Sequence, residues 1–202
     1  MAEFNNTEPY EVRKQKALEE IDAEIASIQE KFNALNEKDN TSPEHCKKCK
    51  GRCCKFPCGF IPSQVMEMLG VDTLTKDNLR KFLETGKYSL DYWNDFDYTD
   101  YFFNDWFLIR YRSRNSPISD EDCNWNGCIN LTEDGCSLPF HQRGADGQAL
   151  VCKTVVKEGF ICDSTIGKRE LGLSWFHYHD ILRELWNEFI TREENGELFN
   201  DN

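Results

Sequence analysis

The chain has 202 residues and a net charge of −12, from 36 Asp and Glu residues against 24 Lys and Arg residues. That length fits one domain of ordinary size with some extension, and it is long enough to bury a core. The acidic balance argues against a general nucleic-acid binder and against adhesion to an anionic membrane, because phosphate groups would repel the protein.

The first predicted element is an amphipathic helix from about Pro9 to Lys38, after an unstructured start with Thr7 as a helix cap. Its apolar residues are spaced 3, 4, 3, 4, 3 and form one seam: Leu18, Ile21, Ile25, Ile28, Phe32 and Leu35. The seam is shorter than a free-standing coiled coil requires. We therefore expect it to pack on another helix of this chain or, by self-association, on a partner subunit. A separate role in binding another protein is the alternative.

A polar linker and a cysteine-rich run precede two short predicted helices, Pro62 to Leu69 and Lys76 to Thr85, the second capped by Thr75 and ended by Gly86. Between Tyr88 and Phe107 half of the residues are aromatic, with five aspartates among them: Asp91, Asp95, Asp97, Asp100 and Asp105. We expect the aromatic residues to form core and the aspartates to lie at turns. A surface for a cationic or aromatic ligand is the alternative.

Three short strands and a last helix complete the predicted elements. The strands are Leu108–Arg114, Ile129–Leu131 and Leu150–Val156, the last of them after the turn residues GADG. The helix runs from about Leu173 to Glu193, with an apolar stripe of Ile181, Leu182, Leu185, Trp186, Phe189 and Ile190. That stripe is the natural partner for the seam of the first helix.

The ten cysteines carry the strongest chemical signal. The first residues form no apolar targeting segment, so we expect a cytoplasmic protein, in which thiols stay reduced. Five cysteines fall within thirteen residues, in the pattern C-x2-C-x3-C-C-x3-C from Cys46 to Cys58. In a reducing compartment this density favours metal binding or catalysis over a disulfide framework. A thiol–disulfide protein without metal is a third interpretation. The presence of as many as ten cysteines argues against it.

The spacing of the first cysteines resembles a metal knuckle, in which two thiolates two residues apart turn onto one ion. Neighbouring side chains diverge, so one of Cys53 and Cys54 would join the knuckle while the other faces a second centre or the core. The later cysteines lie at predicted strand ends and turns and would supply the remaining ligands of the metal site that the first cluster begins. The predicted metal ligands are Cys46, Cys49, Cys53, Cys54, Cys58, Cys128, Cys136, Cys152 and Cys162.

Thiolate ligands select zinc, an iron–sulfur cluster such as 4Fe–4S, or Cu(I), and spacing does not decide among them. Five cations lie among the first thiols: Lys47, Lys48, Lys50, Arg52 and Lys55. They would offset the charge of a thiolate cluster, or else form a basic patch for an anionic partner. His141 could add a nitrogen ligand. His177 and His179 would face different sides of a helix and make a poor metal pair.

The segments CKKCKGRCC, GCINLTEDGCSLPFHQR and VCK resemble the YkgJ-type cysteine-cluster family, described as a putative zinc- or iron-chelating domain. LRKFLETGKYSLDYWN is similar to the middle region of that family, and the resemblance covers roughly residues 44 to 165. It implies ligand roles for Cys46, Cys49, Cys53, Cys54, Cys128, Cys136 and Cys152, and after these a ligand role for Cys162. Cys58 and Cys123 stand outside the family pattern. It implies metal binding more than any particular reaction.

The sequence therefore predicts an α+β, helix-rich single domain with a small antiparallel sheet, organised around a cysteine-ligated metal, with its N- and C-terminal helices packed together. Residues 1–43 would form the first helix and linker, 44–170 the metal-binding domain, and 171–202 the last helix. The predicted function is metal binding with zinc or an iron–sulfur cluster. An iron–sulfur enzyme or redox protein acting on a protein or small molecule is the alternative.

Overall fold

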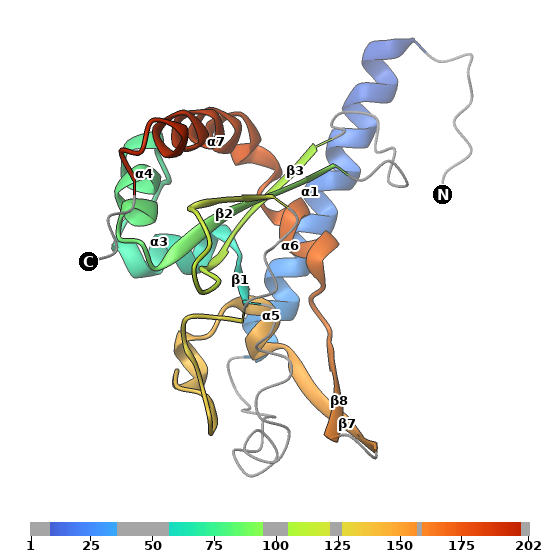
Figure 1. Cartoon of the computed structure of the whole chain (residues 1–202). Coiled ribbons are helices and arrows are strands. Elements are labelled where there is room, and N and C mark those ends of the chain that lie inside the picture. The colour runs from blue at the N-terminus through green and yellow to red at the C-terminus, as the bar shows by residue number, and fades with distance from the viewer. Residues whose placement is uncertain (1–8, 36–56, 95–104, 122–126, 157–158, 199–202) are drawn as a thin grey trace.

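The computed structural model describes residues 9–35, 57–94, 105–121, 127–156 and 159–198. Of Asn94 and of the strand residues 151–156 and 159–163 it describes the backbone alone. Helices and strands both occur along these ranges, with five strands in succession from residue 88 to residue 136, which confirms the predicted α+β class (Figure 1). Across the same ranges, no helix has both the length and the apolar character needed to cross a bilayer.

Six α-helices and two 3-10 turns occur in the described ranges. They are α1 (Tyr10–Leu35), α3 (Pro62–Leu69), α4 (Lys76–Glu84), α5 (Ala145–Gln148), α6 (Lys168–Ser174), α7 (His179–Glu194), η2 (Phe140–Gln142) and η3 (Phe176–Tyr178). The two short helices after the cysteine-rich run match their predicted positions. Thr75 caps α4 as predicted, accepting a hydrogen bond from the backbone N–H of Asn78 at 3.3 Å.

The central sheet has four strands in the order β1 (Gly59–Phe60), β3 (Asp105–Tyr111), β2 (Tyr88–Asn94) and β4 (Ser119–Glu121). β3 runs antiparallel to β1 and β2, but β4 runs parallel to β2. The predicted antiparallel sheet is therefore wrong for this edge, and the sheet is mixed. Sequence patterns mark a strand without revealing which neighbour it will pair with.

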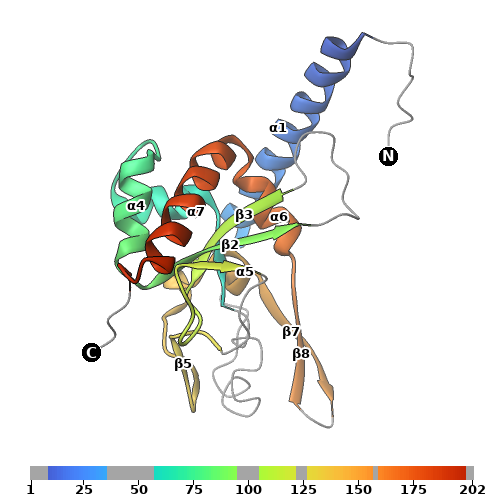
Figure 2. The same ribbon diagram turned by 45° about the horizontal axis from the view of Figure 1, so that its top comes forward.

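Two separate antiparallel ribbons leave the body of the protein at one end (Figures 1 and 2). One joins β5 (Leu131–Thr132) to β6 (Gly135–Cys136), and β5 begins two residues later than the predicted strand 129–131. The other joins β7 (Leu150–Val156), as predicted, to β8 (Gly159–Ser164). The GADG residues before β7 begin the helical turn α5, where a plain turn was expected.

Helices cover both faces of the central sheet. On one face Phe82 of α4 stacks on Tyr88 with ring centroids 3.9 Å apart, and Trp186 of α7 lies 5.2 Å from Tyr92. On the other face α6 lies against the paired residues Trp93 and Trp106, and only a glycine fits there. A Cβ built on Gly172 would come within 2.8 Å of Trp93. The described aromatic residues of the stretch are thus core, as predicted, while residues 95–104 lie outside the described residues.

The expected pairing of the first helix with the last is wrong. The seam of α1 packs chiefly on α6, with Ile28 and Phe32 buried, and Glu24 accepts a 3.0 Å ion-pair hydrogen bond from Arg169. The stripe of α7 covers β3, β4 and α4 instead. The N-terminal end of α1 extends beyond the other helices (Figure 1), and Tyr10 there is 62% exposed. An apolar stripe indicates that a helix packs against another part of the protein, but it does not identify the element on which the helix packs.

The last predicted helix is in fact two helices, α6 and α7, with η3 between them. Trp175 accepts the backbone N–H of Tyr178 at 2.8 Å and donates its own N–H to Gly172 at 3.0 Å, which turns the chain. The turn lets Trp175 reach the core, where it is 1% exposed and its Nε1 donates to the carbonyl of Phe60 at 2.7 Å. Helical periodicity alone did not predict this break.

The aspartates of the aromatic stretch are not all at turns. Asp91 lies in the middle of β2 and is 1% exposed, so the expectation was wrong for this residue. Its carboxylate lies 3.6 Å from Nε of the buried Arg110. Asp105 begins β3, where Arg183 donates three hydrogen bonds of 2.9 to 3.2 Å to its carboxylate. Asp95, Asp97 and Asp100 lie outside the described residues.

Charged side chains join α4 to α7. Glu188 accepts hydrogen bonds from Arg80 at 2.6 and 3.0 Å, and these bonds hold the pKa of its carboxyl below the ordinary value of 4.5. Replacing Glu188 with Gln should therefore lower the free energy of unfolding by about 1 kcal/mol at pH 7.

The contribution of Glu188 depends on pH in a defined direction. Because its pKa is lowered by folding, the stabilisation is complete above the unfolded-state pKa and is lost as the pH falls through the folded-state value. Urea unfolding of the wild type and E188Q at pH 7 and pH 3 measures the difference. A gap that does not narrow at pH 3 would contradict the assignment.

Candidate metal centre

Three of the nine predicted ligands have described side chains: Cys58, Cys128 and Cys136. Cys46, Cys49, Cys53 and Cys54 lie outside the described residues, as do the five cations predicted among them and Cys123. For Cys152 and Cys162 the backbone is described. The geometry of the site can therefore be built from five of the nine positions.

Cys58 stands directly before β1 and packs on α5. Its carbonyl accepts the backbone N–H of Tyr111 at 2.9 Å, which places it on the β1 edge of β3. Its sulfur lies against Gly147, where an added Cβ would be 2.3 Å from Sγ. Asp146 holds α5 in place by accepting the N–H of Gly59 at 2.9 Å. The position of this thiol thus depends on a glycine 89 residues later in the chain.

Replacing Gly147 with Ala should displace the Cys58 sulfur and lower the free energy of unfolding by about 1–3 kcal/mol, as overpacking does. The same change in a Cys58→Ala background should cost much less, because the nearest remaining side-chain atom would be the Cβ of residue 58, at 3.1 Å. The four denaturation curves form a double-mutant cycle. Equal costs in the two backgrounds would contradict the contact.

The β7–β8 ribbon starts next to Cys58. β7 begins at Leu150, shortly after α5, and Ser164 at the end of β8 donates its hydroxyl to the carbonyl of Asp146 at 3.0 Å. Cys152 and Cys162 are paired directly across the ribbon, two residues from its base on each strand. Asp146 therefore ties the base of this ribbon to the residue that follows Cys58.

Cys128 lies just beyond the end of β3, on the side of β2. It forms an antiparallel bridge with Ser113 and is 5% exposed. Its sulfur accepts hydrogen bonds from Asn130, at 3.4 Å from the backbone N and 3.7 Å from Nδ2. Burial raises the pKa of this thiol, and the two Asn130 hydrogen bonds oppose that rise. Backbone N–H groups directed at a sulfur are the arrangement that stabilises a ligating thiolate.

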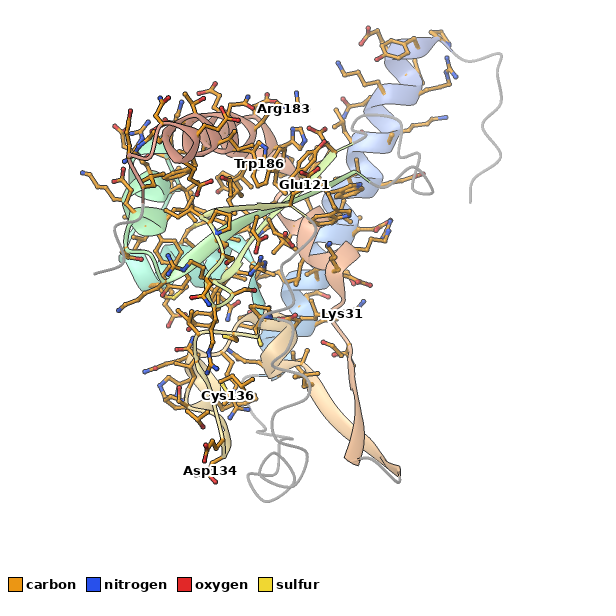
Figure 3. The ribbon with its side chains drawn as sticks, in the orientation of Figure 1. Lys31, Glu121, Asp134, Cys136, Arg183 and Trp186 are labelled. Carbon is orange, nitrogen blue, oxygen red and sulfur yellow. The ribbon has the colours of Figure 1, made fainter. Side chains whose placement is uncertain are left out.

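Cys136 belongs to the same ribbon as Asn130. It lies in β6, paired with Leu131, and is close enough to Cys128 for their charges to interact. Figure 3 shows Cys136 near Asp134 on this ribbon, at the end of the protein away from Trp186 and Arg183. Cys128 and Cys136 therefore form one local pair of thiols.

Tyr111 lies within electrostatic range of all three described thiols. Its side chain is buried, and its hydroxyl donates to the carbonyl of Gln142 at 2.6 Å. Burial is the main reason that the pKa of Tyr111 is raised, and charge on Tyr88 and then on Cys58, Cys128 and Cys136 raises it further. The phenol is thus within electrostatic range of thiols from two segments far apart in the chain.

A buried cation lies beside Cys128. The Arg110 side chain is 2% exposed and is held by Asp120, by the Tyr111 carbonyl at 2.9 Å and by the Ser113 hydroxyl at 3.3 Å. Its charge opposes the rise in the pKa of Cys128. A fixed guanidinium is a suitable partner for negative charge on this thiol.

The three described histidines take no part in this arrangement. His177 contacts Asp22 of α1 at 2.8 Å, while the buried His179 lies 3.2 Å from Asp105, so the two face different sides as expected. His141 is exposed on η2. Within the ranges that the structure covers, no three or more His, Cys, Asp or Glu side chains are grouped closely enough to hold a metal ion.

Sequence reasoning missed three residues of the site: Tyr111, Asn130 and Arg110. Asn130 had a detectable signal, because an amide two residues after a cysteine can direct its N–H at the sulfur. Tyr111 and Arg110 had none, since they reach the thiols only through the pairing of β3 with segments far away in the chain.

Comparison of the chain with models of known protein families, with curated proteins and with solved structures finds no match. The resemblance to the cysteine-cluster family stays a prediction.

Proposed function

We propose that this chain is a metal-binding protein that holds zinc or an iron–sulfur cluster with cysteine thiolates. One observation carries the proposal: Cys58 and the Cys128–Cys136 pair come from segments far apart in the chain, and all three thiols lie within electrostatic range of one buried phenol, Tyr111. Thiols that merely fill a core have no reason to converge in this way. The ten cysteines of the sequence supply enough ligands for such a centre.

The surroundings of Cys128 fit a ligating thiolate. Two N–H groups of Asn130 point at its sulfur, and the buried Arg110 supplies a positive charge nearby. A thiolate bound to a metal ion keeps part of its negative charge, so hydrogen-bond donors and cations stabilise it. A thiol with only a packing role would not need either.

Anaerobic purification followed by elemental analysis and a visible spectrum tests the proposal on the full chain. We expect zinc or iron to copurify in a fixed ratio to protein. Asn130→Ala should weaken retention of the metal against a competing chelator by 10–100-fold, as loss of an outer hydrogen bond to a ligand does. Asn33→Ala, on the exposed side of α1, is the matched control.

The outcome also separates the two predicted functions. A colourless protein with zinc would point to a structural centre. A brown protein with absorbance near 400 nm and about four irons per chain would favour the iron–sulfur enzyme or redox protein. Protein that carries neither metal after anaerobic purification, and binds neither on reconstitution, would refute the proposal.

A further inference from the structure

We infer that the described thiols belong to two separate metal centres, one on each edge of β3. This inference rests on the proposed function and deepens it by assigning ligands to centres. The first set, the ribbon group, is Cys58 with Cys152 and Cys162. The second set, the hairpin group, is Cys128 with Cys136. The other five cysteines are assigned to neither group.

Backbone hydrogen bonds place the two groups on opposite edges of one strand. The N–H of Tyr111 donates to Cys58 on the β1 edge, whereas the N–H of Arg112 donates to Lys87 on the β2 edge. Cys128 continues the β2 edge, because its neighbour Ile129 donates to the Arg112 carbonyl at 3.1 Å. Successive residues of a strand direct their hydrogen bonds to alternate edges, so β3 separates Cys58 from Cys128.

The separation is too large for one ion. Two strand spacings across the sheet and two residues along it place the Cα atoms of Cys58 and Cys128 roughly 11 Å apart. Two cysteines on one zinc ion have Cα atoms no more than roughly 10 Å apart, because the Zn–S bonds are about 2.3 Å long and one Cβ joins each sulfur to its Cα. The buried Tyr111 ring also lies within electrostatic range of the sulfurs of Cys58 and Cys128.

Hydrogen bonds and strand pairing link the segments that carry the members of each group. Asp146 contacts both Gly59, next to Cys58, and Ser164, at the base of the ribbon in which Cys152 and Cys162 are paired. In the hairpin group, Cys128 and Cys136 interact electrostatically, and the N–H of Leu131, the strand partner of Cys136, donates to the Cys128 carbonyl at 3.0 Å. The structure therefore supports a division of these thiols into the ribbon group on one side of β3 and the hairpin group on the other.

Metal content of double variants tests the division. The full chain is purified anaerobically as wild type, as C128S/C136S and as C152S/C162S, and zinc and iron are measured per chain. We expect each double variant to lose about half of the metal and to keep the rest. Cys123→Ser, which changes a cysteine of neither group, should keep the full content.

A second measurement needs no variant and so does not depend on variants that fold. The wild type is titrated with EDTA and alkylated with iodoacetamide at each step, and the modified cysteines are identified by mass spectrometry. Cys128 and Cys136 should become reactive together, and Cys152 and Cys162 together at a different EDTA concentration.

The failures of the two proposals are distinguishable. If metal is present but either double variant loses all of it, or if all four cysteines become reactive in one step, the thiols share one centre and the division is wrong. A single 4Fe–4S cluster would give that result. If the wild type holds no metal, the proposed function is refuted and this inference with it.

Discussion

Replacing Arg110 with Met is expected to lower the free energy of unfolding by about 3–5 kcal/mol, the cost of leaving buried charges without their partner. Arg110 is the largest charged side chain in the core, and it contacts the buried carboxylates of Asp91 and Asp120. Met fills similar space, so the loss would come from charge and hydrogen bonding and not from a cavity. Urea denaturation at pH 7 measures the change.

The control removes the carboxylates as well. In R110M/D91N/D120N no buried charge is left unpaired, and we expect much of the lost stability to return, because a neutral core often equals or exceeds a buried ion network in stability. A triple variant as unstable as R110M would show that the cost lies in packing. Lys168, 4.0 Å from Asp91 and 47% exposed, is too weakly placed to replace Arg110.

Replacing Trp175 with Ala should cost about 3–5 kcal/mol, the usual range for a buried tryptophan. Trp175 is the largest fully buried side chain in the described ranges, and it connects the end of α6 to the carbonyl of Phe60 in β1. Because Phe60 is two residues from Cys58, the same variant should also make Cys58 react faster with iodoacetamide. Denaturation curves and alkylation rates provide the two readouts.

Trp175→Phe separates the two contributions of this residue. It keeps most of the ring but loses the Nε1 donor, so we expect a cost of about 1–3 kcal/mol from the unpaired buried carbonyl and the smaller ring. Tyr10→Ala, at a 62% exposed position, should stay within about 0.5 kcal/mol of wild type. A W175A variant no less stable than Y10A would contradict the role of Trp175.

Local structure followed from local sequence where the signal was complete within a few residues. The capped helix α4 and the strand β7 lie where the sequence predicted them. Their determinants are a Thr75 cap, a Gly86 stop and a short run of β-branched residues, all within the element or beside it. The split at Trp175 escaped prediction because the tryptophan leaves the helical path to reach a partner 115 residues away.

The same contrast between local sequence signals and long-range contacts holds for the candidate site. Cysteine density and spacing predicted from the sequence alone that the thiols are metal ligands, because thiolate chemistry needs only residue type and proximity along the chain. Which thiols lie together was not predictable. Gly147 packs on Cys58, and Ser113 pairs with Cys128, through contacts between distant segments.

What the sequence by itself determined is therefore the class of the fold and the elements whose signals are local, such as α3, α4 and β7. It also predicted the chemical character of the site. The tertiary structure alone decided that α1 packs on α6, that Arg110 and Asp91 are buried together, and that β3 stands between Cys58 and Cys128. The physical reason is that propensity, capping and side-chain chemistry act over one or two turns of chain. Strand pairing and packing are chosen by the total free energy of many weak contacts among segments far apart in sequence.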